Sequence, residues 1–154
     1  MGYTLNLAVC SRFLSLPPIK MAIFNLEKIQ SYAMTYDEFN HFCGSLKATT
    51  YIVQWGNSHL WKVGGKVFAI GGWEKTNEPA FTFKASDLDY EILRDANGFR
   101  PAPYMASRGM KWIQQYATSH NTDEQLKYYI EASHYLASLG LTKKKQRELG
   151  LNQS

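Results

Sequence analysis

The residues of this sequence that are best suited to chemistry are lysines that alternate with apolar residues, accompanied by aromatic rings. Lysine ammonium groups bind phosphate oxygens, and exposed aromatic rings stack on nucleobases. If the strands described below share one sheet, six such residues could reach a nucleic acid from its open face or edge: Lys62, Lys66, Lys84, Lys111, Tyr104 and Trp112. The alternative stays open that the lysines only solubilise the sheet and that Trp112 belongs to the core.

Two further basic groups lie outside the predicted strands. Arg100 begins the proline-rich segment Arg100–Tyr104, where it suits a phosphate contact, a bond to a local carbonyl or a helix cap. A cationic run near the end of the chain suits either nonspecific nucleic-acid binding or a solvated last helical turn that complements the helix dipole. This run contains Lys143, Lys144, Lys145 and Arg147.

Catalytic and metal chemistry find little support in the sequence. The four histidines are scattered without the spacing of common metal sites: His41, His59, His120 and His134. Cys43 falls on an apolar helical stripe, which favours a buried structural thiol over a nucleophile. No glycine-rich phosphate motif precedes a helix. We therefore predict no enzyme activity, no metal site and no cofactor.

The net charge of +4 is concentrated towards the two ends of the chain. Residues 35–142 carry a net charge of −1, whereas residues 1–34 carry +2 and residues 143–154 carry +3. The sequence pI near 9.0 therefore says little about the surface of the folded body. This distribution weakens the electrostatic case for DNA binding.

The length of 154 residues suits one soluble domain with a single core. We predict a leader of uncertain structure over residues 1–34, followed by that domain over residues 35–154. No apolar run approaches the roughly 20 residues that span a bilayer, and the leader lacks the basic start of a signal peptide. Cys10 and Cys43 have no framework spacing, which favours free thiols and a cytoplasmic location.

The clearest local geometry is a β-hairpin within residues 54–72, centred on Gly64-Gly65. Two glycines supply the positive φ angles of a two-residue type I′ turn, and this turn predicts that Trp61 pairs with Phe68. The predicted core face consists of Trp61, Val63, Phe68 and Ile70. The predicted outer face consists of Leu60, Lys62, Val67 and Ala69. Function is expected on the outer side, where Lys62 and Lys66 are the residues to test.

Capping residues and periodicity predict the remaining elements. Helices begin at the capping box Thr35-x-x-Glu38, at Ser86 and at Thr122, and the last of them ends at Gly140. Strands are predicted over residues 49–53, 80–84 and 111–116, in addition to the hairpin. This order predicts an α+β fold, a two-layer domain in which an antiparallel sheet carries helices on one face and is partly open on the other.

Several blocks resemble, in order, the MmcQ/YjbR family. They are the hairpin WKVGGKVFA, the strand ending in Phe83-Lys84, the segment Arg100–Tyr104, Lys111-Trp112-Ile113 and the segment Leu141–Lys145. The resemblance covers about residues 35–151. It implies a small cytoplasmic bacterial protein with a frataxin-like (CyaY-like) or secretion-chaperone-like fold, which binds DNA through a double-wing arrangement of hairpins.

Two hypotheses follow from these observations. The first is a DNA-binding domain that uses the hairpin, the basic residues named above and the cationic run. The second is a non-enzymatic, chaperone-like module whose open sheet face or sheet edge accepts a protein partner, as the near-neutral body and the aromatic richness suggest. Neither hypothesis involves a membrane.

Overall fold

The computed structural model describes residues 34–117 and 122–154, which belong to one compact unit spanning Ala33–Ser154. The predicted leader, apart from Met34, lies outside the described residues. The described helices are α3 (Tyr36–Ser45), α4 (Asp87–Leu93), the 3-10 helix η1 (Ala106–Arg108), α5 (Asp123–Leu139) and α6 (Lys143–Glu148). The described strands are β1 (Thr49–Gln54), β2 (Ser58–Val63), β3 (Lys66–Gly71), β4 (Phe81–Lys84), β5 (Phe99–Pro101) and β6 (Trp112–Gln115).

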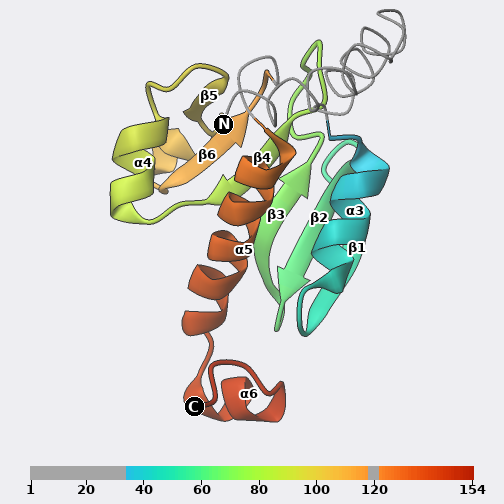
Figure 1. The fold of residues 1–154 in the computed structure, drawn as a ribbon, viewed down its shortest axis with the longest axis vertical. Helices are drawn as coiled ribbons and strands as arrows, with labels where there is room; N and C mark the ends of the chain where they lie inside the picture. Colours follow the sequence, from blue (N-terminus) through green and yellow to red (C-terminus); the bar gives the residue numbers. More distant parts are fainter. Residues whose placement is uncertain (1–33, 118–121) are drawn as a thin grey trace, which may run out of the picture. The chain divides into compact units, whose positions relative to one another are not determined.

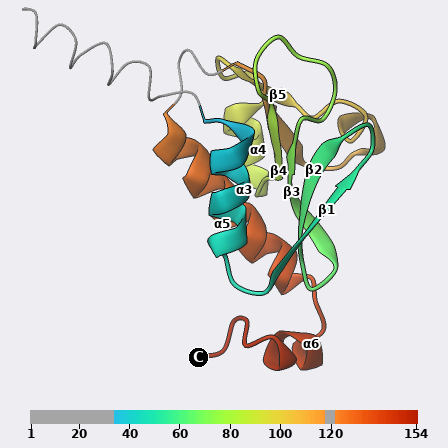
Figure 2. The same cartoon turned by 90° about the vertical axis from the view of Figure 1, so that its right-hand side faces the viewer.

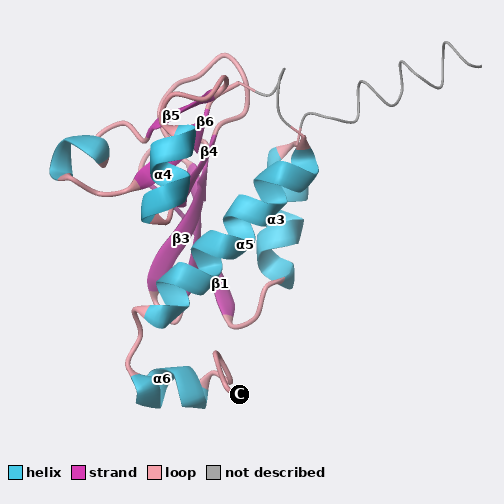
Figure 3. Ribbon diagram, turned by 60° about the vertical axis from the view of Figure 1, so that its left-hand side comes forward, coloured by secondary structure: helices cyan, strands magenta, loops and turns pink. Residues whose placement is uncertain are grey.

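The strands of the described residues form one antiparallel sheet in the order β1-β2-β3-β4-β6-β5. Helices α3, α4 and α5 cover one face of this sheet, as Figures 1 and 2 show. Figure 3 shows α3 and α5 side by side in front of the strands. The predicted two-layer α+β architecture is therefore confirmed.

The helix-covered face holds the main core. The capping box at the start of α3 forms as predicted, because Thr35 Oγ1 accepts from the Glu38 N–H and the Glu38 carboxylate accepts from the Thr35 N–H. This start orients α3 so that Phe39 and Cys43 are fully buried. They pack with strand residues that point towards the helices, which are Trp61, Val63, Phe68, Phe81, Phe83 and Ile113.

The β2–β3 turn forms as predicted, with φ angles of +56° at Gly64 and +90° at Gly65. Pairing follows the prediction only next to the turn, because the register then shifts and Trp61 pairs with Ala69. Phe68 has no direct partner in β2, so it is the extra residue of a β-bulge. On the helix side, the Ser133 hydroxyl of α5 donates to the Phe68 carbonyl at 2.6 Å.

The bulge inverts the predicted faces of β3 beyond it. Ile70 pairs with Leu60 and packs on the outer face, whereas Ala69 joins the core beneath the helices. The prediction that Ile70 lies on the core face and Ala69 on the outer face was wrong. The physical reason is that one extra residue reverses the alternation of every residue that follows it.

The centre of the outer face is covered by the chain after β5. Leu60 and Ile70 are fully buried there, and Trp112 is 6% exposed, beneath Ala102 and Met105. The Ala102 N–H donates to the Trp112 carbonyl at 2.8 Å, which holds this covering segment against β6. Trp112 therefore belongs to a second, smaller core, and burial removes it from the candidates for base stacking.

The cationic run forms a helix of its own. Gly140 ends α5 as predicted, but the Thr142 side chain then accepts from the Lys145 N–H at 3.1 Å and caps the new helix α6. The interpretation of the run as a solvated last helical turn therefore holds for Lys145 and Arg147, which lie in the last turn of α6, but not for the residues that follow the Thr142 cap directly. Lys143 and Lys144 consequently begin α6, where the helix dipole is unfavourable to cations.

Candidate nucleic-acid interface

Three segments that are distant in the sequence meet beside the β2–β3 turn. A Cβ added to Gly64 would lie 2.6 Å from Leu141 Cδ1 and 3.1 Å from Leu149 Cδ1, so both ends of α6 pack against the turn. The connection between α3 and β1 is also near, because a Cβ on Gly150 would lie 2.9 Å from Lys47 Nζ. Figures 1 and 2 show α6 at this end of the sheet.

Seven cationic side chains come from these segments, and we call this region the basic end. Glu148 is the single acidic residue of these segments, which we take as residues 46–49, 62–67 and 140–154. The cations are Lys47, Lys62, Lys66, Lys143, Lys144, Lys145 and Arg147. All are exposed except Lys62, which is half-buried. The basic end thus joins three cations of residues 35–142, a range whose net charge is −1, with the four cations of the run near the end of the chain.

The two hairpin lysines leave the sheet on opposite sides. Lys62 pairs with Val67 and lies on the outer face, whereas Lys66 pairs with Val63 on the helix-covered side. The Lys66 ammonium lies beside the end of α5, since a Cβ on Gly140 would be 3.5 Å from Lys66 Nζ. Placing both lysines on the outer face was therefore wrong, because directly paired residues share a face and Val63 is a core residue.

Lys84 extends the positive surface across the outer face. It ends β4, pairs with Trp112 and is exposed. The pairing of Phe83 with Ala69 places Lys84 level with the bulge and close to the turn end of β3. Lys62 and Lys84 therefore share the outer face with one strand between them, a separation of about 10 Å.

Lys111 and Arg100 are held by other side chains and are not part of the basic end. Lys111 Nζ lies 2.8 Å from Asp87 Oδ1, and this hydrogen bond raises the pKa of Lys111. Arg100 Nε and Nη2 donate to Gln114 Oε1 at 2.9 and 2.7 Å, and the guanidinium lies 5.0 Å from the centre of the Tyr116 ring. Lys111 ties the start of α4 to β6, and Arg100 belongs to a network around the buried Gln114.

A family model described as YjbR matches residues 44–136, which is more than half of the chain. The chain belongs to the YjbR family. The predicted family is confirmed, and the match covers the whole sheet together with most of α5. No match to this YjbR chain is found among curated proteins.

Two solved structures resemble the YjbR chain in fold. A Deinococcus radiodurans protein with the family-model domain DUF419 superposes with a TM-score of 0.67 and 20% identity, covering 80% of this chain and 92% of its own. A Pseudomonas syringae protein superposes with a TM-score of 0.55 and 18% identity, covering 68% of this chain and 99% of its own. At this identity both similarities establish the fold alone.

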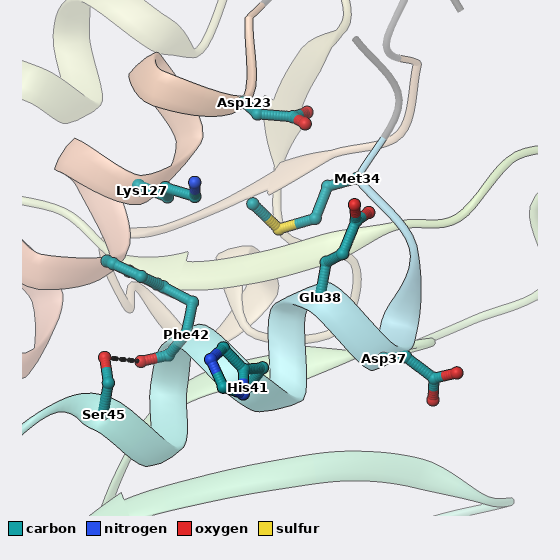
Figure 4. A pocket seen from close by; sticks show the side chains of 8 residues that line it. All are labelled: Met34, Asp37, Glu38, His41, Phe42, Ser45, Asp123 and Lys127. Carbon is teal, nitrogen blue, oxygen red and sulfur yellow. Dashed lines mark hydrogen bonds between the residues drawn. The ribbon is translucent and has the colours of Figure 1, made fainter. Parts of the chain in front are cut away.

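A hollow of about 430 Å³ at the other end of the YjbR domain carries the opposite charge. Figure 4 shows Met34 between the carboxylates of Glu38 and Asp123, at the starts of α3 and α5. Hydrogen bonds from Thr35 hold the pKa of Glu38 below its usual value, whereas burial, and then the charge of Glu38, raise the pKa of Asp123. Glu38 thus acts in helix capping, which accounts for its position in the hollow.

Two general features hold for the described part of the YjbR chain. Its His, Cys, Asp and Glu residues form no group of three that could bind a metal ion, and His120 lies outside the described residues. Its helices include none with the length and apolar character needed to cross a membrane.

Sequence reasoning missed Lys47 and the surroundings of Tyr104. Lys47 lies in a short connection after α3, where only the fold brings it to the basic end. Tyr104 is exposed at the rim of an apolar hollow of about 500 Å³, which we call the aromatic hollow. Its lining consists of Trp55, Trp73, Tyr104, Met105, Arg108 and Met110. One sequence pattern indicates this hollow. Trp55 and Trp73 each adjoin a glycine in a turn, and both turns lie at the same end of the strands.

Proposed function

We propose that this YjbR domain binds nucleic acid, with DNA as the expected ligand, through the basic end and the neighbouring Lys84. The supporting observation is that seven cations from three distant segments meet at one end of the sheet with Glu148 as the single acidic residue of those segments. The β2–β3 hairpin, which the family resemblance likens to a DNA-binding wing, supplies two of these cations. The proposed role is binding without a catalytic step.

The charge distribution favours one orientation of the domain on a polyanion. Charges within about 10 Å of one another act together at moderate ionic strength, so the cations of the basic end attract phosphates as a group. The carboxylates of Asp37, Glu38 and Asp123 lie around the starts of α3 and α5, away from α6, and repel the same ligand. A cytoplasmic location is part of this proposal, and the free, buried thiol of Cys43 fits it.

Fluorescence anisotropy with a labelled DNA duplex, titrated at several salt concentrations, tests the proposal. If about five phosphates are contacted, the logarithm of the association constant should fall against the logarithm of salt concentration with a slope of about −4.5. If neither this duplex nor its separated strands bind at low salt, the proposed function is ruled out.

A matched pair of variants locates the interface. Replacing Lys143–Lys145 by glutamine removes three charges from α6 and relieves its unfavourable start, so the fold should be kept. The salt slope should become shallower by about one for each lost phosphate contact. The control replaces Lys75, Arg94 and Lys127 by glutamine, which removes equal charge elsewhere. Equal losses of affinity in both variants would show that net charge, and not the basic end, governs binding.

A second candidate function has its own supporting observation. β1 is an edge strand of six uncharged residues, and Tyr51, Ile52 and Val53 are exposed on it. Such an edge can accept an additional strand from a protein partner. Because the outer face is covered at its centre, the edge suits a partner better than the sheet face that the sequence suggested.

The edge can be blocked by a single charge. Ile52→Lys should abolish the recovery of any one protein that co-purifies reproducibly after nuclease treatment, because a lysine opposes strand addition. Tyr128→Lys, on the exposed side of α5, is the matched control and should leave recovery unchanged. A partner that is retained by Ile52→Lys would exclude β1 as its binding site.

A further inference from the structure

The aromatic hollow is built from three segments at the end of the sheet away from the β2–β3 turn. Trp55 lies in the β1–β2 turn, Trp73 follows β3, and Tyr104 and Arg108 belong to the covering segment after β5. The Trp55 and Trp73 rings meet edge to face, with their centres 5.4 Å apart. The Arg108 guanidinium lies 5.0 Å from the centre of the Tyr104 ring.

The two most exposed rings of the hollow are held in an unfavourable backbone conformation. Trp55 has a φ angle of +52° and Tyr104 of +70°, in the left-handed region that bulky residues rarely adopt. Trp55 is 52% exposed and Tyr104 is 61% exposed, so core packing does not explain either ring. Strain at exposed residues that share one hollow is typical of a binding site.

The chemistry of the lining suits a planar, anionic ligand. Indole and phenol rings stack on the face of any nucleobase, and the Arg108 guanidinium adds a flat cation for a base or a phosphate. The lining contains no carboxylate. A DNA duplex conceals its base faces within the stack, so only an unpaired base could enter.

We infer that the aromatic hollow binds an unpaired nucleobase of a single-stranded nucleic acid whose phosphates continue to the basic end. This inference rests on the proposed function and specifies its ligand. β2 connects the two sites, since Trp55 lies just before its start and Gly64 follows its end, and its six residues span about 20 Å. Lys62 lies on the outer face along this path. At about 3.4 Å per stacked nucleotide, some six nucleotides cover the distance.

Anisotropy titrations with a labelled oligothymidylate of about twelve nucleotides, alone and as its duplex with oligoadenylate, test this inference. The wild-type protein should bind the single strand more tightly than the duplex. Trp55→Ala combined with Tyr104→Ala should weaken single-strand binding by about tenfold or more, because stacking on each ring is lost. Duplex binding should remain unchanged.

Control variants separate stacking from folding. Trp55→Phe combined with Tyr104→Phe keeps two rings and should retain most of the affinity for the single strand. Tyr128→Ala combined with Tyr135→Ala removes two exposed rings from α5 and should have no effect. The single strand should also quench tryptophan fluorescence, and Trp55→Phe should reduce this quenching, because Trp61 and Trp112 are buried.

The possible results distinguish failure of this inference from failure of the proposed function. The first informative result is that the Trp55→Ala/Tyr104→Ala variant binds the single strand normally while glutamine at Lys143–Lys145 weakens binding. The aromatic hollow is then not a base site, whereas the basic end is still a nucleic-acid site. Equal wild-type affinity for both DNA forms also overturns the inference. If neither form binds at low salt, the proposed function fails and the inference fails with it.

Discussion

Replacing Gly64 by alanine tests whether α6 is docked on the β2–β3 turn. The new Cβ would lie 2.6 Å from Leu141 Cδ1, whereas carbon atoms pack at about 3.5–4.0 Å. Overpacking of this kind costs about 1–3 kcal/mol, and the φ angle of +56° adds about 1–2 kcal/mol for a residue with a Cβ. We expect the free energy of unfolding to fall by about 2–5 kcal/mol, measured by urea denaturation with tryptophan fluorescence.

A double-mutant cycle with Leu141→Ala separates the clash from the backbone strain. Shortening Leu141 relieves the closest contact and leaves the backbone strain and the 3.1 Å contact with Leu149, so Gly64→Ala should cost about 1–3 kcal/mol less in the Leu141→Ala background. Gly65→Ala is the matched control, because Gly65 also has a positive φ but no described atom lies within 4 Å of an added Cβ. The losses of stability caused by Gly65→Ala and Leu141→Ala should therefore be additive. If the losses caused by Gly64→Ala and Leu141→Ala are also additive, α6 is not docked on the turn.

Two further expectations concern the core. Ser133→Ala should lower the free energy of unfolding by about 1–3 kcal/mol, because the Phe68 carbonyl and the Lys84 N–H lose a buried partner. The control Ser45→Ala, at an exposed site, should change the free energy of unfolding little. Equal losses of stability in the two variants would contradict the role of Ser133. Burial raises the pKa of the Cys43 thiol, so the unfolded chain ionises first as pH rises. The stability difference between wild type and Cys43→Ala, from urea denaturation at several pH values, should be constant below about pH 8.5 and move against wild type above it; a constant difference at all pH values would argue against burial of the thiol.

The sequence predicts this fold best where one or two residues decide the local geometry. The Gly64-Gly65 turn and the Thr35–Glu38 capping box are of this kind, since their backbone requirements are met by adjacent residues. The bulge at Phe68 is different, because it is stabilised by a hydrogen bond from Ser133, which lies 65 residues away. No alternation pattern within the hairpin contains that information.

The candidate site was harder to predict because its residues are assembled by topology. Counting charge along the sequence averaged the lysines of the hairpin with the carboxylates at the starts of α3 and α5, although the fold separates them. Lys47 joins the basic end only because its connection lies beside Gly150. Burial of Trp112 likewise depends on the return of the covering segment over the outer face.

The position of Lys143 and Lys144 at the start of α6 gives salt two opposing effects on this domain. Without a ligand, the lysines repel one another and the positive end of the helix dipole, so added ions should screen the repulsion and favour the docked α6. With a polyanion bound, the same ions compete for the lysines and release the ligand. Bound nucleic acid should therefore substitute for salt as the counterion that keeps the C-terminal helix folded. Protection of the α6 amides from hydrogen exchange should rise when salt is added and also when nucleic acid is bound.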